Sequence, residues 1–190
     1  MTTAILSALP EEQSSLVQHL SHAQRVMHAG RAFWRGEVLG RPVVLALSGI
    51  GKVAAATTAT ALIERFGVAR IVFTGVAGGV GAGVNVGDVV VAREYLQHDM
   101  DASPLFPRWE VPGYAHSRFA CDAALSALLS GAASAYLASA EGLFDLKSAD
   151  GAPVDIARIP RVHQGLVISG DRFVCAASEA EQLRNTLRSA

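Results

Sequence analysis

The stretch from Ile71 to Ala92 constrains the fold most, because it places a cluster of glycines between two apolar runs. The first run is Ile71–Phe73, and the second begins at Val89, directly after Gly87 and Asp88. Short apolar runs bounded by glycine are typical of buried strands in a sheet that helices cover on both faces. The stretch therefore predicts a strand, an open loop and a second strand.

This loop holds five glycines within nine residues, namely Gly75, Gly78, Gly79, Gly81 and Gly83. Glycine at the end of a buried strand lets backbone N–H groups approach a ligand, because no side chain stands in the way. A tight connection without a ligand would also use glycine, but so many glycines favour a ligand site.

The composition limits the partners that such a chain can bind. Its 190 residues fit one domain, and 16 basic against 17 acidic residues give a net charge of −1. Because no run of Lys or Arg breaks this balance, the sequence argues against nucleic acid and against a membrane surface as partners. Charged residues make up 17% of the chain, against about 25% in typical domains, which indicates extensive burial. We expect a small neutral or zwitterionic ligand.

The cysteines and the N-terminus favour a cytoplasmic protein. Cys121 and Cys175 lie far apart, which suggests neither a disulfide framework nor a zinc site. The N-terminus has no basic segment and reaches an acidic residue at Glu11, so it does not resemble a signal peptide. The uncharged stretch Ala123–Ala140 is interrupted by serines and by Gly131, which predicts a buried helix and not a membrane span.

Apolar periodicity and turn residues predict strands alternating with helices. The predicted strands are Thr3–Leu9, two antiparallel strands within Arg25–Leu39, Val43–Leu47, Ile71–Phe73, a strand that runs from Val89 to Asp101, and Gln164–Ser169. The predicted helices begin at Pro10 and after Gly51, span Phe119–Ala140, and run from Ser178 to Ala190. A lid or interface loop is expected at His98–Tyr114, and a surface loop at Lys147–Pro160.

Polar or glycine-rich segments follow several of these strands. Glu11 and Glu12 follow the first strand, and Ser48–Lys52, Gly75–Gly79 and Asp171–Phe173 follow later ones. In an open α/β sheet the carboxyl ends of the strands form one edge, where ligands bind. A carboxylate at that edge can act as a general base on water. Alternatively, the two glutamates complement the dipole of their helix and do nothing more.

Other patterns carry less information about function. Gly49–Ala54 fits the G-x-G-x-x-A fingerprint of dinucleotide binding, but the next strand ends at Thr74-Gly75 without the acid that holds a ribose. His98–Asp101 lies on an extended segment that directs alternate side chains to opposite faces, which favours structural hydrogen bonds over a metal site. Phe173 could stack on a base or belong to the core.

Six motifs occur in one order and spacing that is known from a single enzyme family. They are Ala8–Glu12 (ALPEE), Ser48–Ala56 (SGIGKVAAA), Phe73–Gly79 (FTGVAGG), Val86–Val90 (VGDVV), His98–Asp101 (HDMD) and Ser169–Phe173 (SGDRF). Together they resemble the 5'-methylthioadenosine/S-adenosylhomocysteine nucleosidases of the purine nucleoside phosphorylase superfamily. The resemblance runs from the first strand to about Cys175, and SGIGKVAAA is its most specific part.

The resemblance implies a fold, an assembly and a reaction. The fold is α/β, with three layers (α/β/α) on a mixed central sheet, as one nucleosidase-type domain over residues 1–190. The assembly is a homodimer, without a cofactor or a metal. The reaction is hydrolysis of the N-glycosidic bond of 5'-methylthioadenosine and S-adenosylhomocysteine, which releases adenine for purine salvage and the methionine and methyl cycles.

The resemblance also implies roles for individual residues. Glu12 would activate the attacking water. The residues that it places at the substrate are Ala8, Ile50, Val76, Ala77, Gly78, Phe173 and Val174. Within this set Phe173 lies beside the adenine and the backbone of Val174 hydrogen-bonds the base. Phe106 and Pro112 belong to a segment that one subunit lends to the pocket of its partner.

Water is the expected nucleophile, because Glu11 and Glu12 would repel a phosphate bound near the first strand. Phosphorylases of the superfamily bind phosphate with arginines there and with a serine or threonine in the glycine loop, where this sequence has Val76. The family's Met-Glu pair, and the aspartate that protonates the purine, would follow Ala190. We therefore expect the C-terminal strand and helix of the family to be missing from these residues, and we assign no general acid.

Two other functions fit the same motifs. One is another purine-nucleoside hydrolase or phosphorylase of the superfamily, such as futalosine hydrolase. The other is an inactive relative that still binds nucleosides. An insertion at Leu143–Pro160 leaves the preference among substrates open.

Overall fold

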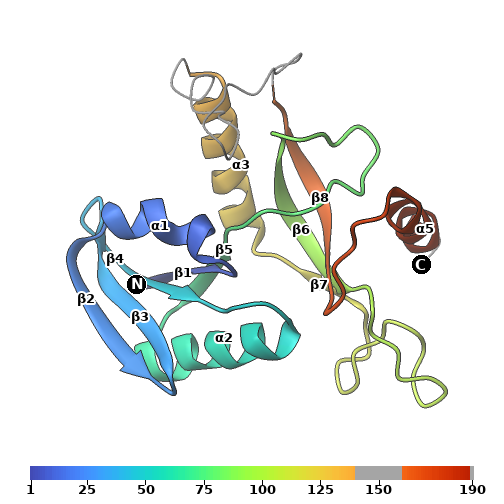
Figure 1. Ribbon diagram of the computed structural model, residues 1–190, viewed down its shortest axis with the longest axis horizontal. Coiled ribbons are helices and arrows are strands. Elements are labelled where there is room, and N and C mark those ends of the chain that lie inside the picture. The colour runs from blue at the N-terminus through green and yellow to red at the C-terminus, as the bar shows by residue number, and fades with distance from the viewer. Residues whose placement is uncertain (140–159, 189–190) are drawn as a thin grey trace. The chain divides into compact units, whose positions relative to one another are not determined.

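The computed structural model describes residues 1–139 and 160–188 (Figure 1). The chain divides into two compact units, Met1–Ala77 and Gly78–Ala190, and each is described by itself. Apart from Pro160, the predicted loop Lys147–Pro160 and the insertion Leu143–Pro160 lie outside the described residues. The expectation of one nucleosidase-type domain over residues 1–190 stays a prediction.

The first unit is a five-stranded mixed sheet with two helices. Its elements are β1 (Thr3–Ser7), α1 (Pro10–Gln18), β2 (Ser21–His28), β3 (Arg31–Val38), β4 (Arg41–Leu47), α2 (Lys52–Phe66) and β5 (Arg70–Phe73). The strand order is β2-β3-β4-β1-β5. β4 and β5 flank β1 in parallel, and β2, β3 and β4 pair antiparallel. The predicted α/β class with a mixed sheet is confirmed.

Alternation along the strands gives this sheet two apolar faces, because successive side chains of a strand point to opposite sides. The even-numbered residues Ala4 and Leu6 of β1 belong to a cluster with Leu62 of α2. Ile5, between them, packs in a second cluster with Leu16 of α1. Figure 1 shows α1 and α2 on opposite faces of the sheet, so the first unit has the predicted α/β/α layers.

The second unit holds a three-stranded sheet of order β7-β6-β8. Its elements are β6 (Val89–Gln97), β7 (Arg118–Ala120), α3 (Ala123–Leu137), β8 (Val162–Ser169) and α5 (Ala177–Arg188). β6 pairs with β8 in parallel and with β7 antiparallel. Within this unit α3 and α5 lie on opposite sides of the β6–β8 pair (Figure 1).

Two predicted boundaries in this unit are wrong. Phe119, placed in a helix, belongs to β7, and the helix begins at Ala123. The physical reason is Asp122, whose side chain caps the helix by accepting a 2.7 Å hydrogen bond from Leu125 N–H. The strand predicted to reach Asp101 ends at Gln97, because the N–H of Met100 donates to the Gln97 carbonyl and the chain turns.

The strand–loop–strand prediction for Ile71–Ala92 is confirmed by β5 and β6. Within the described ranges, the helices lack the combination of length and apolarity that a membrane crossing requires.

Candidate active site

The carboxyl ends of β4, β1 and β5 meet at one edge of the first sheet. Ser48 donates its N–H to the Ser7 carbonyl at 2.8 Å, and Thr74 donates its N–H to the Leu6 carbonyl at 2.9 Å. The hydroxyls of Ser7 and Thr74 are 3.0 Å apart and share a hydrogen bond. The two glycine turns that follow β4 and β5 therefore flank the end of β1, as predicted for that edge.

Glu12 reaches this edge from the first turn of α1. Its Oε2 accepts hydrogen bonds from the N–H groups of Ala8 and Leu9, each at 2.9 Å. Its Oε1 accepts a third, also at 2.9 Å, from the N–H of Val76 in the glycine loop after β5. A glutamate that only complemented a helix dipole would not need a partner 64 positions away, so the contact favours a site role over that alternative.

Gly75 makes room for this carboxylate. A Cβ at Gly75 would lie 2.8 Å from Oε1 of Glu12 and 3.1 Å from its Cδ. Separations below about 3 Å between a carbon and these atoms are repulsive. A residue with a side chain at position 75 would therefore displace Glu12, which gives the first glycine of the loop a steric role.

Hydrogen bonding, and not burial, decides the protonation of Glu12. Burial by itself raises the pKa of the carboxyl, but the N–H donors of Val76, Leu9 and Ala8 together lower the pKa below its usual value. The group is therefore ionised at neutral pH. A carboxylate has about four acceptor positions, and Oε1 accepts one of these three bonds, so it has capacity for a hydrogen bond from water.

Gln13, which the sequence analysis missed, fixes the helix that carries Glu12. Its side chain is 3% exposed and donates from Nε2 to the carbonyl of Ala46 at 2.8 Å, with Ile5 as a longer partner at 3.5 Å. A buried amide that donates hydrogen bonds to two strands fixes the position of α1 on the sheet. The available signal was a polar residue on the apolar side of a predicted helix, next to Glu12.

The turn that carries Ile50 is built from glycines and capped by an arginine. Gly49 and Gly51 have φ of 75° and 98°, in a region that favours glycine. Arg31 donates from its guanidinium to the carbonyl of Ser48 at 2.8 Å. Ile50 is exposed at the tip of this turn, at the carboxyl end of β4, and its predicted contact with the substrate stays a prediction.

The predicted site residues fall into both units. Glu12, Ala8 and Val76 are in contact in the first unit, which ends at Ala77. The substrate residues in the second unit are Gly78, Phe173 and Val174, and their placement beside Glu12 stays a prediction. Phe173 is 91% exposed, so its ring does not pack into the core of the second unit.

The loop that holds Phe106 and Pro112 is anchored through Trp109. The indole N–H of Trp109 donates to the carbonyl of His98 at 3.1 Å, and its backbone N–H donates to Met100 at 3.0 Å. Phe106 is half-buried and Pro112 is exposed. Their predicted contact with a partner subunit stays a prediction.

The His98–Asp101 motif makes hydrogen bonds, as predicted. Asp99 accepts from the N–H of Asp171 at 2.7 Å, and Asp101 accepts from the N–H of Ser103 at 3.0 Å. The hydroxyl and the N–H of Ser103 lower the pKa of Asp101. Among the described residues, no group of three or more His, Cys, Asp or Glu could hold a metal ion.

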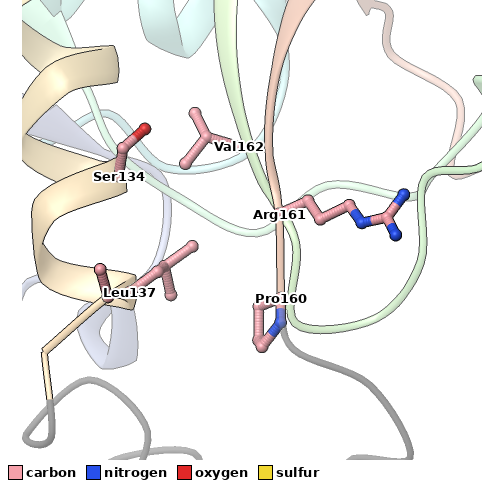
Figure 2. Close-up of a pocket in the computed structure, with 6 residues that line it drawn as sticks. Ser134, Leu137, Pro160, Arg161 and Val162 are labelled. Carbon is pink, nitrogen blue, oxygen red and sulfur yellow. The ribbon is translucent and has the colours of Figure 1, made fainter.

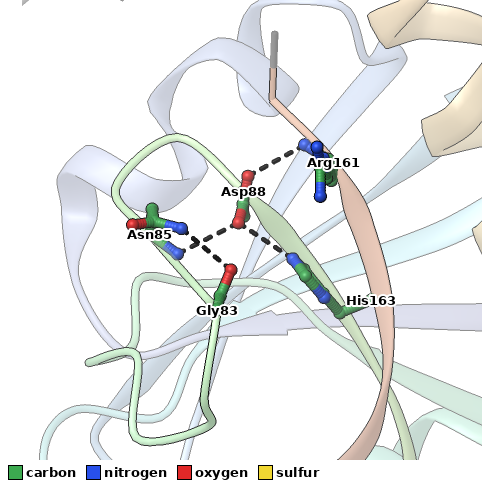
Figure 3. A network of polar contacts seen from close by, with 5 residues as sticks. All are labelled: Gly83, Asn85, Asp88, Arg161 and His163. Carbon is green, nitrogen blue, oxygen red and sulfur yellow. Dashed lines mark hydrogen bonds and ion pairs between the residues drawn. The ribbon is translucent and has the colours of Figure 1, made fainter. Parts of the chain in front are cut away.

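The opposite, amino-terminal end of β6 and β8 carries a polar network around a buried carboxylate (Figure 3). The side chain of Asp88 is fully buried, with 0% exposure. It accepts hydrogen bonds from the N–H groups of Asn85 and Arg161 at 3.0 and 2.8 Å, and it contacts Nε2 of His163 at 2.9 Å. The Asn85 amide in turn donates to Gly83 at 2.8 Å. This network fixes the end of the glycine loop to the start of β8.

An open surface pocket of about 390 Å³ lies near the same end, between the end of α3 and the start of β8 (Figure 2). It is lined by Ser134, Leu137, Ala138, Pro160, Arg161 and Val162. None of these residues belongs to the site predicted from the sequence.

Comparison with known proteins gives a consistent family. The model of the phosphorylase superfamily matches residues 2–190. A 5'-methylthioadenosine/S-adenosylhomocysteine nucleosidase of Shewanella denitrificans is 32% identical over 184 residues, which cover 97% of this chain and 71% of the relative. A nucleosidase of the same name from Chromohalobacter salexigens is 34% identical over 186 residues, covering 95% of this chain and 68% of the relative.

Solved structures agree. The nucleosidase of Neisseria meningitidis, in complex with methylthio-immucillin-A, is similar to this chain with a TM-score of 0.81 and 33% identity, over 98% of this chain and 72% of that one. The nucleosidase of Streptococcus pneumoniae, in complex with 8-aminoadenine, has a TM-score of 0.80 and 29% identity, over 99% and 72%. The nucleoside phosphorylase-like fold expected from the motifs is confirmed.

Proposed function

The chain belongs to the phosphorylase superfamily, and from this membership we propose that it hydrolyses the N-glycosidic bond of 5'-methylthioadenosine and S-adenosylhomocysteine, releasing adenine. The similar proteins of Shewanella denitrificans and Chromohalobacter salexigens are named as nucleosidases for these two substrates. The similar structures hold a methylthio-immucillin and an aminoadenine.

The observation that carries the proposal is the position of the Glu12 carboxylate. It lies at the carboxyl end of β1, held by N–H donors from its own helix start and from the glycine loop. A carboxylate fixed by three donors needs no reorganisation during a reaction, which is the condition for efficient electrostatic catalysis.

Cleavage of the bond between a purine and ribose builds positive charge on the sugar, so a fixed negative charge beside the sugar stabilises the transition state. Glu12 supplies that charge. Its lowered pKa makes it a weak base toward free water. The C–N bond breaks with its electron pair going to the purine, which takes up a proton from solvent to leave as adenine. As the sugar becomes cationic, the attacking water becomes more acidic, and Oε1 can accept the proton that the water loses as it bonds to the sugar carbon. Glu12 therefore acts first by charge and orientation and then as the proton acceptor.

The remaining residues divide between sugar and base. We assign the sugar and its thio substituent to Ile50 and Val76, beside the backbone of Ala8, and we assign Ala77 and Gly78 to both the sugar and the base. The base belongs to Phe173, whose exposed ring offers a stacking surface, and to the backbone of Val174.

The same family membership supports a proposal for the setting of this reaction. We propose a cytoplasmic homodimer in which Phe106 and Pro112 of one subunit complete the pocket of the other. Its products would enter purine salvage and methionine recycling.

Water is favoured over phosphate as the nucleophile. The ionised carboxylate of Glu12 lies at the carboxyl end of β1, and it repels a phosphate anion at short range. Val76 supplies an apolar side chain in the glycine loop and no hydroxyl for a phosphate oxygen.

The test is release of adenine from 5'-methylthioadenosine with and without inorganic phosphate, in the wild type and in Glu12→Gln. We expect phosphate-independent release in the wild type. Glu12→Gln should lower kcat by about 10²-fold or more, while the affinity for a non-hydrolysable adenosine analogue stays within about threefold, because charge stabilisation acts on the transition state.

Three outcomes contradict parts of this proposal. Turnover that requires phosphate would indicate a phosphorylase. Analogue binding without any turnover in the wild type would indicate a nucleoside-binding relative. Equal losses of kcat and of analogue affinity in Glu12→Gln would mean that the carboxylate only positions the ligand.

A further inference from the structure

The parallel strands β6 and β8 end side by side in the second unit. Gln97 pairs with Ser169, and the next N–H, that of His98, donates to the Ser169 carbonyl at 2.9 Å. Two turns therefore leave the sheet at the same place. One is the His98–Asp99 turn, and the other begins at Gly170 and leads into Phe173 and Val174.

A short hydrogen bond joins these turns. Oδ2 of Asp99 accepts from the backbone N–H of Asp171 at 2.7 Å. That length is typical of a hydrogen bond to an ionised acceptor, which is stronger than a bond between neutral groups. The bond fixes the backbone two residues before Phe173.

Gly170 brings the turns into close contact. A Cβ on this residue would overlap the ring of His98 at Nε2, and it would lie 2.9 Å from Cγ of Asp99. Position 170 therefore excludes a side chain. The backbone of the second turn packs directly on His98 and Asp99, so the bond to Asp171 is held at one geometry.

The first turn is itself held in place. The Trp109 indole donates to the His98 carbonyl, and the Arg108 guanidinium lies 5.0 Å from the Trp109 ring centroid. Asp99 thus projects from an anchored turn.

A second contact links the two ends of the segment that carries Phe173. Arg172 donates to Oε1 of Glu179 in α5 at 2.6 Å. In turn, α5 is joined to β7 by the guanidinium of Arg118, which donates to the Leu187 carbonyl at 3.2 Å. Phe173 and Val174 lie between Arg172 and Glu179 in the chain.

We infer that Asp99 is a positioning residue for adenine recognition, acting through the backbone of Asp171 on the Phe173–Val174 segment. This inference rests on the proposed function, which gives that segment the base. Stacking and a backbone hydrogen bond both depend on where the segment's backbone lies. Loss of the Asp99 acceptor therefore weakens base binding without touching the charge that drives cleavage.

The experiment compares Asp99→Ala, Asp99→Asn and the matched control Asp101→Asn. Asp101 is a carboxylate two residues further along the chain, and it accepts a hydrogen bond from the N–H of Ser103, not from the turn that leads to Phe173. The readouts are the Kd of adenine by calorimetry, KM and kcat for 5'-methylthioadenosine, and hydrogen exchange of the Asp171 amide. Circular dichroism checks that each variant is folded.

Asp99→Ala should raise the Kd of adenine and KM by about 10- to 100-fold, the range for one hydrogen bond to a charged group, with kcat within about threefold. Asp99→Asn keeps an uncharged acceptor oxygen, so its Kd for adenine and its KM should lie between those of Asp99→Ala and the wild type. Exchange of the Asp171 amide should accelerate in the same order. Asp101→Asn should leave all three readouts unchanged.

A folded Asp99→Ala with wild-type adenine affinity would overturn the inference, and so would a fall in kcat with KM unchanged. If Asp99→Ala does not fold, Asp99→Asn decides by the same criteria. Failure of the proposed function looks different. A wild type that binds adenine but releases none from the nucleoside would refute the hydrolysis, while the ordered losses of adenine affinity would still support the role of Asp99.

Discussion

Adding one methyl group at Gly75 tests how the candidate catalytic carboxylate is held. In Gly75→Ala the new Cβ would stand 2.8 Å from Oε1 of Glu12 and 3.2 Å from Oε2. To reach an ordinary contact the carboxylate must move by about 0.5 Å. The 2.9 Å bond from Val76 to Oε1 would then exceed the normal range for hydrogen bonds.

The expected cost follows from that bond. A hydrogen bond to a charged group contributes about 1.5–3 kcal/mol, so Gly75→Ala should lower the free energy of unfolding by about that amount. The lower backbone entropy of alanine in the unfolded chain offsets less than about 1 kcal/mol. In a Glu12→Ala background the new methyl group contacts no carboxylate, so Gly75→Ala should lower the free energy of unfolding by less than about 0.5 kcal/mol.

Urea unfolding of the four proteins in this double-mutant cycle measures the coupling between positions 12 and 75. We expect a coupling of at least about 1 kcal/mol, and adenine release by Gly75→Ala should fall toward that of Glu12→Gln. Gly131→Ala, in the interior of α3, is the control for an added methyl group and should be neutral or stabilising. Additive effects of the two substitutions would refute the steric argument.

Three further expectations follow from the same structure. Phe173→Ala should raise KM for 5'-methylthioadenosine by about tenfold or more and leave kcat nearly unchanged, because the ring supplies stacking and no charge; steady-state kinetics would contradict this if kcat fell and KM did not move. The folded pKa of Glu12 lies below its unfolded value, so ionised Glu12 stabilises the fold above about pH 4.3, and this stability is lost as pH falls through the folded pKa. The gap in unfolding free energy between wild type and Glu12→Gln should therefore shrink with acidification, and a constant gap would argue against it. Asp88→Asn should destabilise the protein by about 2–3 kcal/mol in urea, because an amide would turn a donor toward N–H groups that now face a buried carboxylate; an unchanged urea midpoint would count against that account.

Much of the fold follows from local patterns. The alternation at Ala4, Ile5 and Leu6 supplies both faces of the first sheet, and Pro10 and Gly67 mark helix ends as predicted. The boundary at β7 was missed because Phe119 continues an apolar run into the helix. Asp122 indicates the correct start of the helix, because an aspartate directly before an apolar helical pattern is a typical N-cap.

The site was predictable only in part. Glu12 could be placed at the end of β1 because strand order and direction decide which edge it meets. The hydrogen bond from Val76 to Glu12 could not be predicted, because it depends on the conformation of the glycine loop. The bond between Asp99 and Asp171 likewise depends on the register of β6 against β8, which residues 72 positions apart do not encode locally.

Gln13 has a consequence for how this protein could be altered. Two adjacent residues of α1 contact different parts of the first unit. Gln13 donates a hydrogen bond to the carbonyl of Ala46 in the sheet, and Glu12 accepts one from Val76 in the glycine loop. A sideways slip of the helix would move both side chains together. The position of the Glu12 carboxylate thus depends partly on the Gln13 amide, which has no predicted contact with a nucleoside. Variants selected for altered activity can therefore carry substitutions between α1 and the sheet as readily as in the pocket.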